Sequence, residues 1–176
     1  MRSILYLLTA LITAVVILVS CSTGPSLQKY YIDKSDEKGF MTFDLGASLI
    51  QTDSLKLSKE EVKALESLEK LNILMYEGDA ARVQKEKDSV KGLIKSGNYE
   101  QLMKLGSVKK GASISLLGEG DDIDEFVILA HNENSFGVVR VLGDGMTAND
   151  VVTLVSLLQK ADLDAKQLKP LQGLLR

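Results

Sequence analysis

His131 is the only imidazole in this chain of 176 residues, and it ends an apolar run just before Asn132, Glu133 and Asn134. A single histidine can serve as a pH-sensitive group or as one metal ligand, but catalysis or zinc binding needs partners that the motif does not supply. At a strand end, histidine is more often a residue that flanks a hairpin turn. We therefore interpret His131 as a hairpin residue, with a pH-sensitive or metal contact as the alternative.

Five carboxylates gather within seven residues, at Glu119, Asp121, Asp122, Asp124 and Glu125. Oxygen ligands at this density could hold Ca²⁺, which makes Glu119, Asp121 and Asp122 weak candidate metal ligands. Their spacing does not match a D-x-D-x-D-G loop, and a solvated hairpin tip explains them more simply. The sequence thus predicts no resident metal ion and no cofactor.

Gly143, Asp144 and Gly145 precede an expected helix, where backbone amides can receive an anion. Asp144 and Asp150 would repel that anion, so we interpret the glycines as turn formers. The chain has no G-x-S-x-G elbow, no H-E-x-x-H helix and no G-x-x-x-x-G-K-[ST] loop. These absences predict a protein that is not an enzyme, although sequence alone cannot place two carboxylates in a cleft.

Composition narrows the class of protein further. The 21 basic side chains are outnumbered by 24 acidic ones, for a net charge of −3, and there is one Cys. A nucleic-acid binder usually carries excess positive charge, and a disulfide needs two cysteines. We therefore expect a small acidic globular protein that binds neither nucleic acid nor nucleotide.

The first twenty residues form a targeting pattern. Arg2 is followed by an apolar run over residues 4–19, which is typical of a signal peptide and is shorter than the roughly 20 residues that a spanning helix needs. A retained membrane helix is the alternative. Residues 18–21, L-V-S-C, resemble the lipobox of bacterial lipoproteins. The resemblance implies cleavage between Ser20 and Cys21, and acylation of Cys21 with diacylglycerol and palmitate; an ordinary free thiol is the alternative.

The lipobox resemblance also implies a location. Two or three acyl chains hold a protein on a membrane permanently. By resemblance to known sorting signals, Ser22 after the lipidated Cys21 indicates the outer membrane, and the lack of an adjacent acidic cluster favours its periplasmic side. We expect a protein of the cell envelope whose partners are the membrane, through acylated Cys21, and an envelope protein.

The rest of the chain predicts a tether, one domain and a tail. Residues 21–39 are mostly polar and indicate a lipidated Cys with a flexible tether, in which Tyr30, Tyr31 and Ile32 either pack on the domain edge or touch the membrane or a partner. Residues 40–162 are expected to form one α+β domain. Residues 163–176 form a leucine-rich tail, which either packs back as core or contacts a partner through Leu168, Leu171, Leu174 and Leu175.

Hydrophobic periodicity and turn residues predict the elements of that domain. Ser58 with Glu61, and Thr147 with Asp150, are expected to cap helices. We expect strands at residues 40–45, 71–76, 99–105, 112–117, 125–131 and 135–142, and helices at 47–50, from 58, at 80–96 and from 147. The last four strands should form an antiparallel meander, in a mostly antiparallel sheet with helices packed on one face.

These elements resemble the envelope lipoproteins of the domain-of-unknown-function family 4252. The likeness spans residues 39–158 and rests on Y-E-Q-L-M-K-L, L-N-I-L-M-Y, E-F-V-I-L-A and G-D-G-M-T-A-N-D-V-V, with a departure at Gly145. It implies a lipid-anchored α+β domain and adds no reaction. We expect a non-catalytic module for protein binding, envelope maintenance or signalling; the alternative is an envelope hydrolase or hydrophobic-ligand carrier with a cleft beside the sheet.

The lipobox gives the first testable prediction. Intact-mass measurement on the protein isolated from membranes should show that residues 1–20 are removed and that acyl mass is present, because cleavage exposes Cys21 as the acylated amino terminus. Cys21→Ser should abolish both changes. A mass that still includes Met1, or a thiol at Cys21 that reacts with maleimide, contradicts the prediction.

Overall fold

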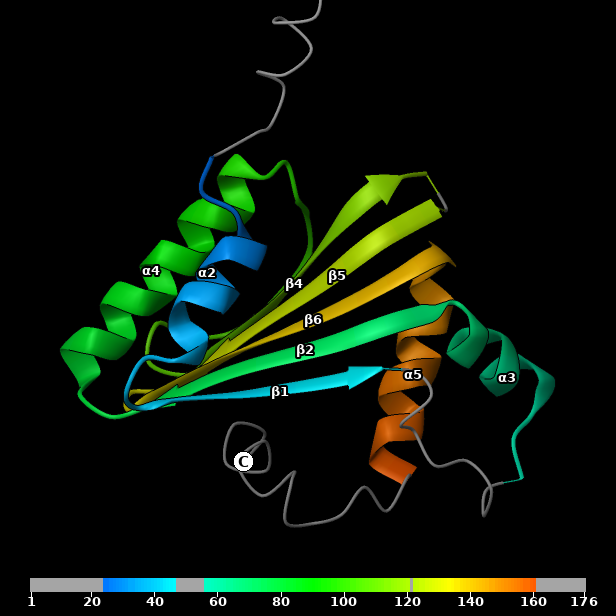
Figure 1. Ribbon diagram of the computed structural model, residues 1–176, viewed down its shortest axis with the longest axis horizontal. Coiled ribbons are helices and arrows are strands. Elements are labelled where there is room, and N and C mark those ends of the chain that lie inside the picture. Colours follow the sequence, from blue (N-terminus) through cyan, green and yellow to red (C-terminus); the bar gives the residue numbers. More distant parts are fainter. Residues whose placement is uncertain (1–23, 47–55, 121, 161–176) are drawn as a thin grey trace, which may run out of the picture.

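The computed structural model describes residues 24–46, 56–120 and 122–160 as one six-stranded antiparallel sheet with helices on both sides (Figure 1). The strand order is β1-β2-β6-β5-β4-β3. The strands are β1 (Phe40–Gly46), β2 (Leu68–Glu77), β3 (Glu100–Gly106), β4 (Gly111–Glu119), β5 (Asp122–His131) and β6 (Ser135–Met146). The helices are α2 (Leu27–Ser35), α3 (Lys59–Glu66), α4 (Ala80–Ser96) and α5 (Ala148–Lys160).

Consecutive strands from β3 to β6 pair antiparallel and form the predicted meander. Strand β2 completes the centre of the sheet by pairing with β1 on one side and β6 on the other. The single α+β domain with a mostly antiparallel sheet is therefore confirmed.

The helices cover both faces of the sheet, so the expectation that they pack on one face is wrong. Leu71, Ile73 and Met75 of β2 join the core beneath α3 and α5, whereas Leu74 and Tyr76 join the core beneath α2 and α4. Successive side chains of a strand point to opposite faces, so the unbroken apolar run of β2 requires cover on both sides. We call the two sides the α3/α5 face and the α2/α4 face.

The predicted tether is wrong over residues 27–35, because these residues form α2. Ser26 caps the helix by accepting a hydrogen bond from the Lys29 amide at 3.1 Å, and Leu27 and Tyr31 are buried against the sheet. The alternative in which the aromatic residues pack on the domain is thus confirmed for Tyr31, while Ile32 stays 57% exposed. The domain begins with α2 rather than with β1.

Two helix starts follow the predicted capping boxes. Ser58 accepts from the Glu61 amide while Glu61 accepts from the Ser58 amide, and Thr147 and Asp150 make the same reciprocal pair. Helix α4 has the predicted bounds, and Asn98 after it adopts a left-handed φ of 60°. Helix α3 faces the core through Ala64, which is fully buried, and Leu65, whereas Val62 is 40% exposed.

Gly143 and Gly145 lie inside β6 instead of forming a turn before the last helix. Leu142 lies opposite Glu125 and Met146 lies opposite Ile123, so residues 143–145 bulge out of the ladder. The Asp144 amide donates to the Ser67 carbonyl at 3.1 Å, which ties this bulge to the end of α3.

Several predicted features lie outside the described residues: the signal peptide with Ser20 and Cys21, the helical turn at 47–50, Asp121, and the tail with Leu168, Leu171, Leu174 and Leu175. Across the ranges that the structure does describe, no helix has the length and apolarity to span a membrane.

Gly143→Ala should destabilise the domain by about 1–3 kcal/mol, because a Cβ at Gly143 would press against the Ser67 carbonyl oxygen, a backbone atom that cannot turn aside. The matched control is Gly92→Ala on α4, where a Cβ meets nothing within 4 Å. That change should stabilise the helix by about 0.5–1 kcal/mol. Urea unfolding followed by circular dichroism measures both; equal midpoints for the two variants contradict the prediction.

Candidate functional site

A buried ion pair occupies the middle of the α2/α4 face. Arg140 of β6 donates from Nε to Oε1 of Glu125 on β5 at 2.6 Å, and from Nη2 to Oε2 at 3.1 Å. The two residues are only 4% and 6% exposed. Such a bidentate pair recovers its desolvation cost only when its remaining hydrogen-bonding groups also find partners.

Those further partners come from α2 and from the start of β3. Arg140 Nη1 donates to Oε1 of Gln28 on α2 at 2.5 Å, and the Tyr99 hydroxyl donates to Oε2 of Glu125 at 2.9 Å. Burial and the Glu125 carboxylate raise the pKa of Tyr99 above its usual range, so it stays a neutral donor. The ion pair therefore joins α2, β3, β5 and β6.

A second polar cluster lies at the edge of the same face. Tyr31 of α2 donates to Asp44 Oδ1 at 3.0 Å, and the buried Asn72 side chain donates to the same oxygen. Burial, followed by the interaction with Asp44, raises the pKa of Tyr31. The carboxylate of Asp44 is thereby tied to α2 and β2.

Glu86 of α4 centres a third cluster, between the two helices. It accepts from the Tyr30 hydroxyl at 2.6 Å and from Lys34 Nζ at 2.9 Å, with Arg82 Nε 3.7 Å away. Burial acts to raise the pKa of Glu86, but the hydrogen bonds from Tyr30 and Lys34 and the nearby cations outweigh it, and the pKa is lowered. Glu86 is therefore a held anion, suited to fixing α2 on α4.

The structure separates Glu125 from Glu119 and Asp122, two other members of the predicted carboxylate cluster. Glu125 turns inward to Arg140, while Glu119 and Asp122 pair at the tip of the β4–β5 hairpin, which confirms a hairpin tip there. Within the described residues, no group of three His, Cys, Asp or Glu side chains could hold a metal ion. What the sequence did not reveal is the role of Glu125, because its partner Arg140 lies on another strand.

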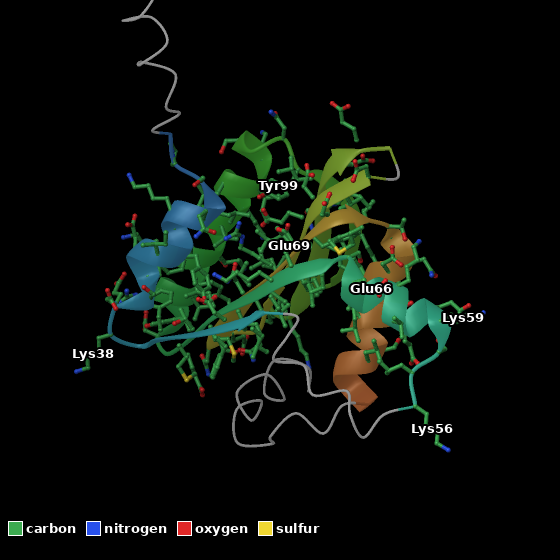
Figure 2. All side chains as sticks on the ribbon, turned by 45° about the vertical axis from the view of Figure 1, so that its right-hand side comes forward. Lys38, Lys56, Lys59, Glu66, Glu69 and Tyr99 are labelled. Atoms are coloured by element: carbon green, nitrogen blue, oxygen red, sulfur yellow. The ribbon has the colours of Figure 1, made fainter. Side chains whose placement is uncertain are left out.

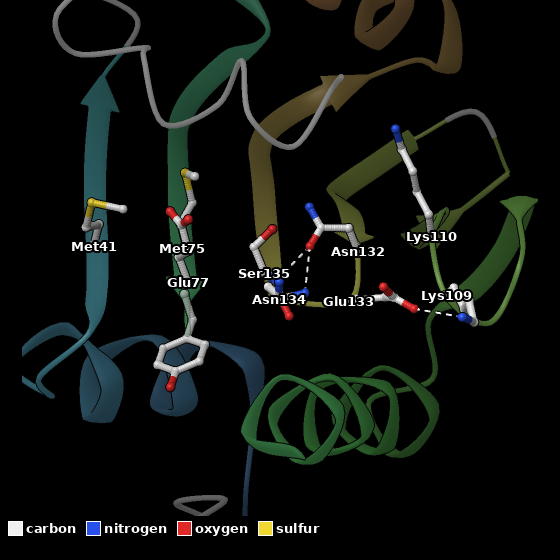
Figure 3. Close-up of a pocket in the computed structure, with 10 residues that line it drawn as sticks. Met41, Met75, Glu77, Lys109, Lys110, Asn132, Glu133, Asn134 and Ser135 are labelled. Atoms are coloured by element: carbon white, nitrogen blue, oxygen red, sulfur yellow. Dashed lines mark hydrogen bonds and ion pairs between the residues drawn. The ribbon is translucent and has the colours of Figure 1, made fainter. Parts of the chain in front are cut away.

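An open pocket of about 590 Å³ lies at one end of the sheet, and Figure 3 shows its lining. Met41 and Met75 lie side by side on β1 and β2 and form its apolar part. The polar part comes from the turn between β5 and β6 and from the turn before β4, where Lys109 Nζ and Glu133 Oε1 are 3.0 Å apart. Asn132 Oδ1 accepts from the amides of Asn134 and Ser135 at 2.9 and 2.8 Å.

The pocket holds two carboxylates, Glu77 and Glu133, but both are exposed, and Glu133 is paired with Lys109. Its hydroxyl-bearing residues, Tyr76 and Ser135, have no histidine beside them among the lining residues. The arrangement offers an apolar surface with a polar rim, and it does not assemble a nucleophile with a base.

Strand β3, which the sequence predicted as a strand but not as an edge, forms an exposed edge of the sheet. Every residue of β3 is exposed, and its sole strand neighbour in the described structure is β4. Leu102, Met103 and Leu105 are 48%, 48% and 58% exposed, and Val108 in the following turn is 84% exposed. The signal in the sequence was the apolar content of E-Q-L-M-K-L-G, in which polar and apolar residues do not alternate regularly.

His131 is the last residue of β5, directly before the turn to β6, as predicted for a hairpin residue. Its Nδ1 atom is buried and has no hydrogen-bond partner in the described part of the chain.

Three lysines, Lys38, Lys56 and Lys59, extend away from the domain (Figure 2).

Comparison with protein families gives one match. The model of the family described as Domain of unknown function (DUF4252) matches residues 30–154, which is most of the chain. No curated protein matches the chain.

Arg140→Met should cost about 3–5 kcal/mol of stability, because it leaves the Glu125 carboxylate buried without its counter-charge. The double variant Arg140→Met with Glu125→Leu should recover most of that loss, since it removes both buried charges. Lys109→Met is the control, as it breaks the exposed pair with Glu133 and should cost less than about 1 kcal/mol. Urea unfolding gives the three values; a single Arg140 variant no weaker than the control contradicts this account.

Proposed function

Because the chain belongs to the DUF4252 family, whose domain is of unknown function, we propose that it is a lipid-anchored, non-catalytic protein of the cell envelope that binds another protein along the exposed edge of β3. The observation that carries this proposal is the concentration of exposed apolar side chains on an unpaired strand edge.

The anchor rests on the L-V-S-C pattern at residues 18–21 and determines where the domain works. Helix α2 begins at Leu27, so five residues, 22–26, separate Cys21 from the folded domain. A chain of that length reaches at most about 18 Å. An acylated Cys21 would therefore hold the domain close to the lipid surface, where it meets proteins of the same membrane or the space beside it.

The edge of β3 can accept another strand. A strand with one neighbour presents a row of backbone N–H and C=O groups on its other side, and proteins commonly protect such edges with charge or a bulge. Strand β3 has a bulge between Gln101 and Met103 and one central charge, Lys104. This protection is incomplete, because Leu102, Met103 and Leu105 expose apolar side chains of a kind that solvent-exposed edges usually avoid.

The occupant that fits this edge is an extended segment of a partner protein, in which apolar side chains are flanked by acidic ones. Backbone pairing requires an extended segment, and the leucines of β3 favour apolar contacts. Lys104 and the turn residues Lys109 and Lys110 carry three positive charges, against the negative charges of Glu100 and of Glu133, which pairs with Lys109. Acidic residues in the partner would complement that excess.

The proposal of a non-catalytic role is supported by the state of the buried carboxylates. Glu125 and Glu86 each accept several hydrogen bonds or ion pairs from neighbouring elements. A carboxylate whose oxygens are held by partners within the fold fixes the position of helices and is not directed at a substrate.

A hydrophobic-ligand carrier is the second candidate, favoured by the open pocket with Met41 and Met75. Its volume of about 590 Å³ falls within the usual range of ligand sites, roughly 300–1,000 Å³. Methionine side chains adapt to varied apolar ligands. A native mass spectrum of the isolated protein with a bound small molecule would favour this function over strand binding.

Amide hydrogen exchange in native membranes tests the docking edge. Amides of β3 should exchange more slowly in membranes than in the detergent-purified protein, because a partner strand would pair with them. Leu102→Lys with Leu105→Lys should remove that protection and weaken partner binding by about 2 kcal/mol or more, since it puts charge into an apolar contact.

The matched control is Val152→Lys on α5. Like Leu102 and Leu105 this residue is exposed, at 65%, but it lies away from the edge. Protection of β3 should survive this change. Exchange in β3 that is equally fast in membranes and in detergent would sink the proposal. Protection that persists in pure concentrated protein would identify a second copy of the chain as the partner strand and would overturn the choice of a different protein.

A further inference from the structure

The two flanks of α4 have opposite electrostatic settings. On one flank, Glu86 is neutralised by Tyr30 and Lys34 of α2. On the other flank, Lys87 and Lys91 lie one helical turn apart on α4, whose Val90 shares a core cluster with Leu129 of β5, and their charges act on His131 at the end of that strand. On the first flank the carboxylate is held by direct contacts, whereas on the second flank the described residues provide Lys87 only with the nearby carboxylate of Asp88.

The sheet beneath this second flank adds another cation. Lys104 of β3 lies opposite Ser113 of β4, on the α2/α4 face, and it also acts on His131. Next along the same face, Gly106, Gly111 and His131 lie opposite one another on β3, β4 and β5. The two glycines bring no side chains, and a Cβ on Gly111 would lie 3.3 Å from His131 Nε2.

Two polar groups in this region are buried without the partner that their chemistry calls for. Lys87 is only 4% exposed, and among the described residues its Nζ donates to the neutral Oε1 of Gln84, at 2.7 Å, while the exposed Asp88 acts on its charge. The Nδ1 atom of His131 is buried with no hydrogen-bond partner among the described residues. Burying an ammonium group without a counter-charge costs several kcal/mol, and a bound anion would offset that cost.

We propose that Lys87, Lys91, Lys104 and His131 form a binding site for a phosphate group. Three ammonium groups match a phosphate dianion in charge, and an imidazole can add one directed N–H. Asp88, the one carboxylate that acts on Lys87, leaves the cluster with an excess of positive charge. This site is on the sheet face beside α4; it shares Lys104 with the proposed docking edge of β3, and its other residues lie on α4 and β5.

The electrostatics of the cluster favour the binding of an anion. Burial, followed by repulsion from Lys87, Lys91 and Lys104, lowers the pKa of His131 below 6.5, and burial with Lys91 lowers the pKa of Lys87. A group whose pKa is lowered by folding destabilises the fold as pH falls below its unfolded value, here about 6.5. A bound phosphate would reverse the repulsion and raise both pKa values.

Because His131 is the only histidine, its ring protons report on the site in the full chain by NMR. Inorganic phosphate should bind with a Kd on the order of 1 mM and raise the pKa of His131 by about one pH unit, equivalent to about tenfold tighter binding to the protonated form. Sodium chloride at matched ionic strength should give a much smaller rise, because it screens the lysines without occupying the site.

Lys91→Gln with Lys104→Gln should abolish the phosphate effect, and both residues are exposed, so the fold should survive. Lys85→Gln with Lys95→Gln removes two exposed charges from the same protein and should keep the effect. Equal losses in the two double variants would overturn the proposal, because they would reveal a response to net charge alone.

Vesicles of phosphatidylcholine with and without phosphatidic acid separate the two sources of a phosphate group. A rise in the pKa of His131 with inorganic phosphate but not with phosphatidic acid vesicles supports a soluble phosphate ligand. A rise with vesicles that contain phosphatidic acid, and not with phosphatidylcholine vesicles, supports a lipid headgroup. If neither probe raises the pKa of His131 beyond the chloride control, the site does not exist.

Discussion

The buried pair of Arg140 and Glu125 is the constraint around which the α2/α4 face is built. Both side chains project from central strands, where water cannot reach them, so each remaining hydrogen-bonding group needs a protein partner. Gln28 reaches Arg140 from α2, and Tyr99 reaches Glu125 from the start of β3. The segment before β1 is thus an integral part of the fold, because without it a guanidinium group would face an uncovered sheet.

The two faces of the sheet are stabilised in different ways. Beneath α3 and α5 the core is apolar, and the polar contacts are those that cap the helices, such as Thr147 with Asp150. Beneath α2 and α4, apolar contacts alternate with three polar clusters. Hydrogen bonds are directional, so these clusters fix the rotation of α2 as well as its position. A short helix can in this way hold the sheet in one orientation.

That arrangement separates the functional surfaces that we propose. Strand β1 follows directly from α2 at one edge of the sheet, and β3 is the opposite edge. The apolar residues of β3 therefore lie across the width of the sheet from the strand that follows α2. The lysine cluster lies between, where α4 crosses the sheet, and the methionine pocket opens at the end of the strands near the β5–β6 turn.

The sequence by itself determined the local structure: helix starts at Ser58 and Thr147, the bounds of α4, and the order of strands in the meander. These features depend on contacts between residues close in the chain, which capping, periodicity and turn residues report directly. Only the tertiary structure decided that residues 27–35 are a packed helix, that helices cover both faces, and that Glu125 belongs to Arg140 rather than to a metal loop. Polar residues such as Gln28 look solvated in a linear sequence, and their partners lie up to 112 positions away, a separation that local patterns do not encode.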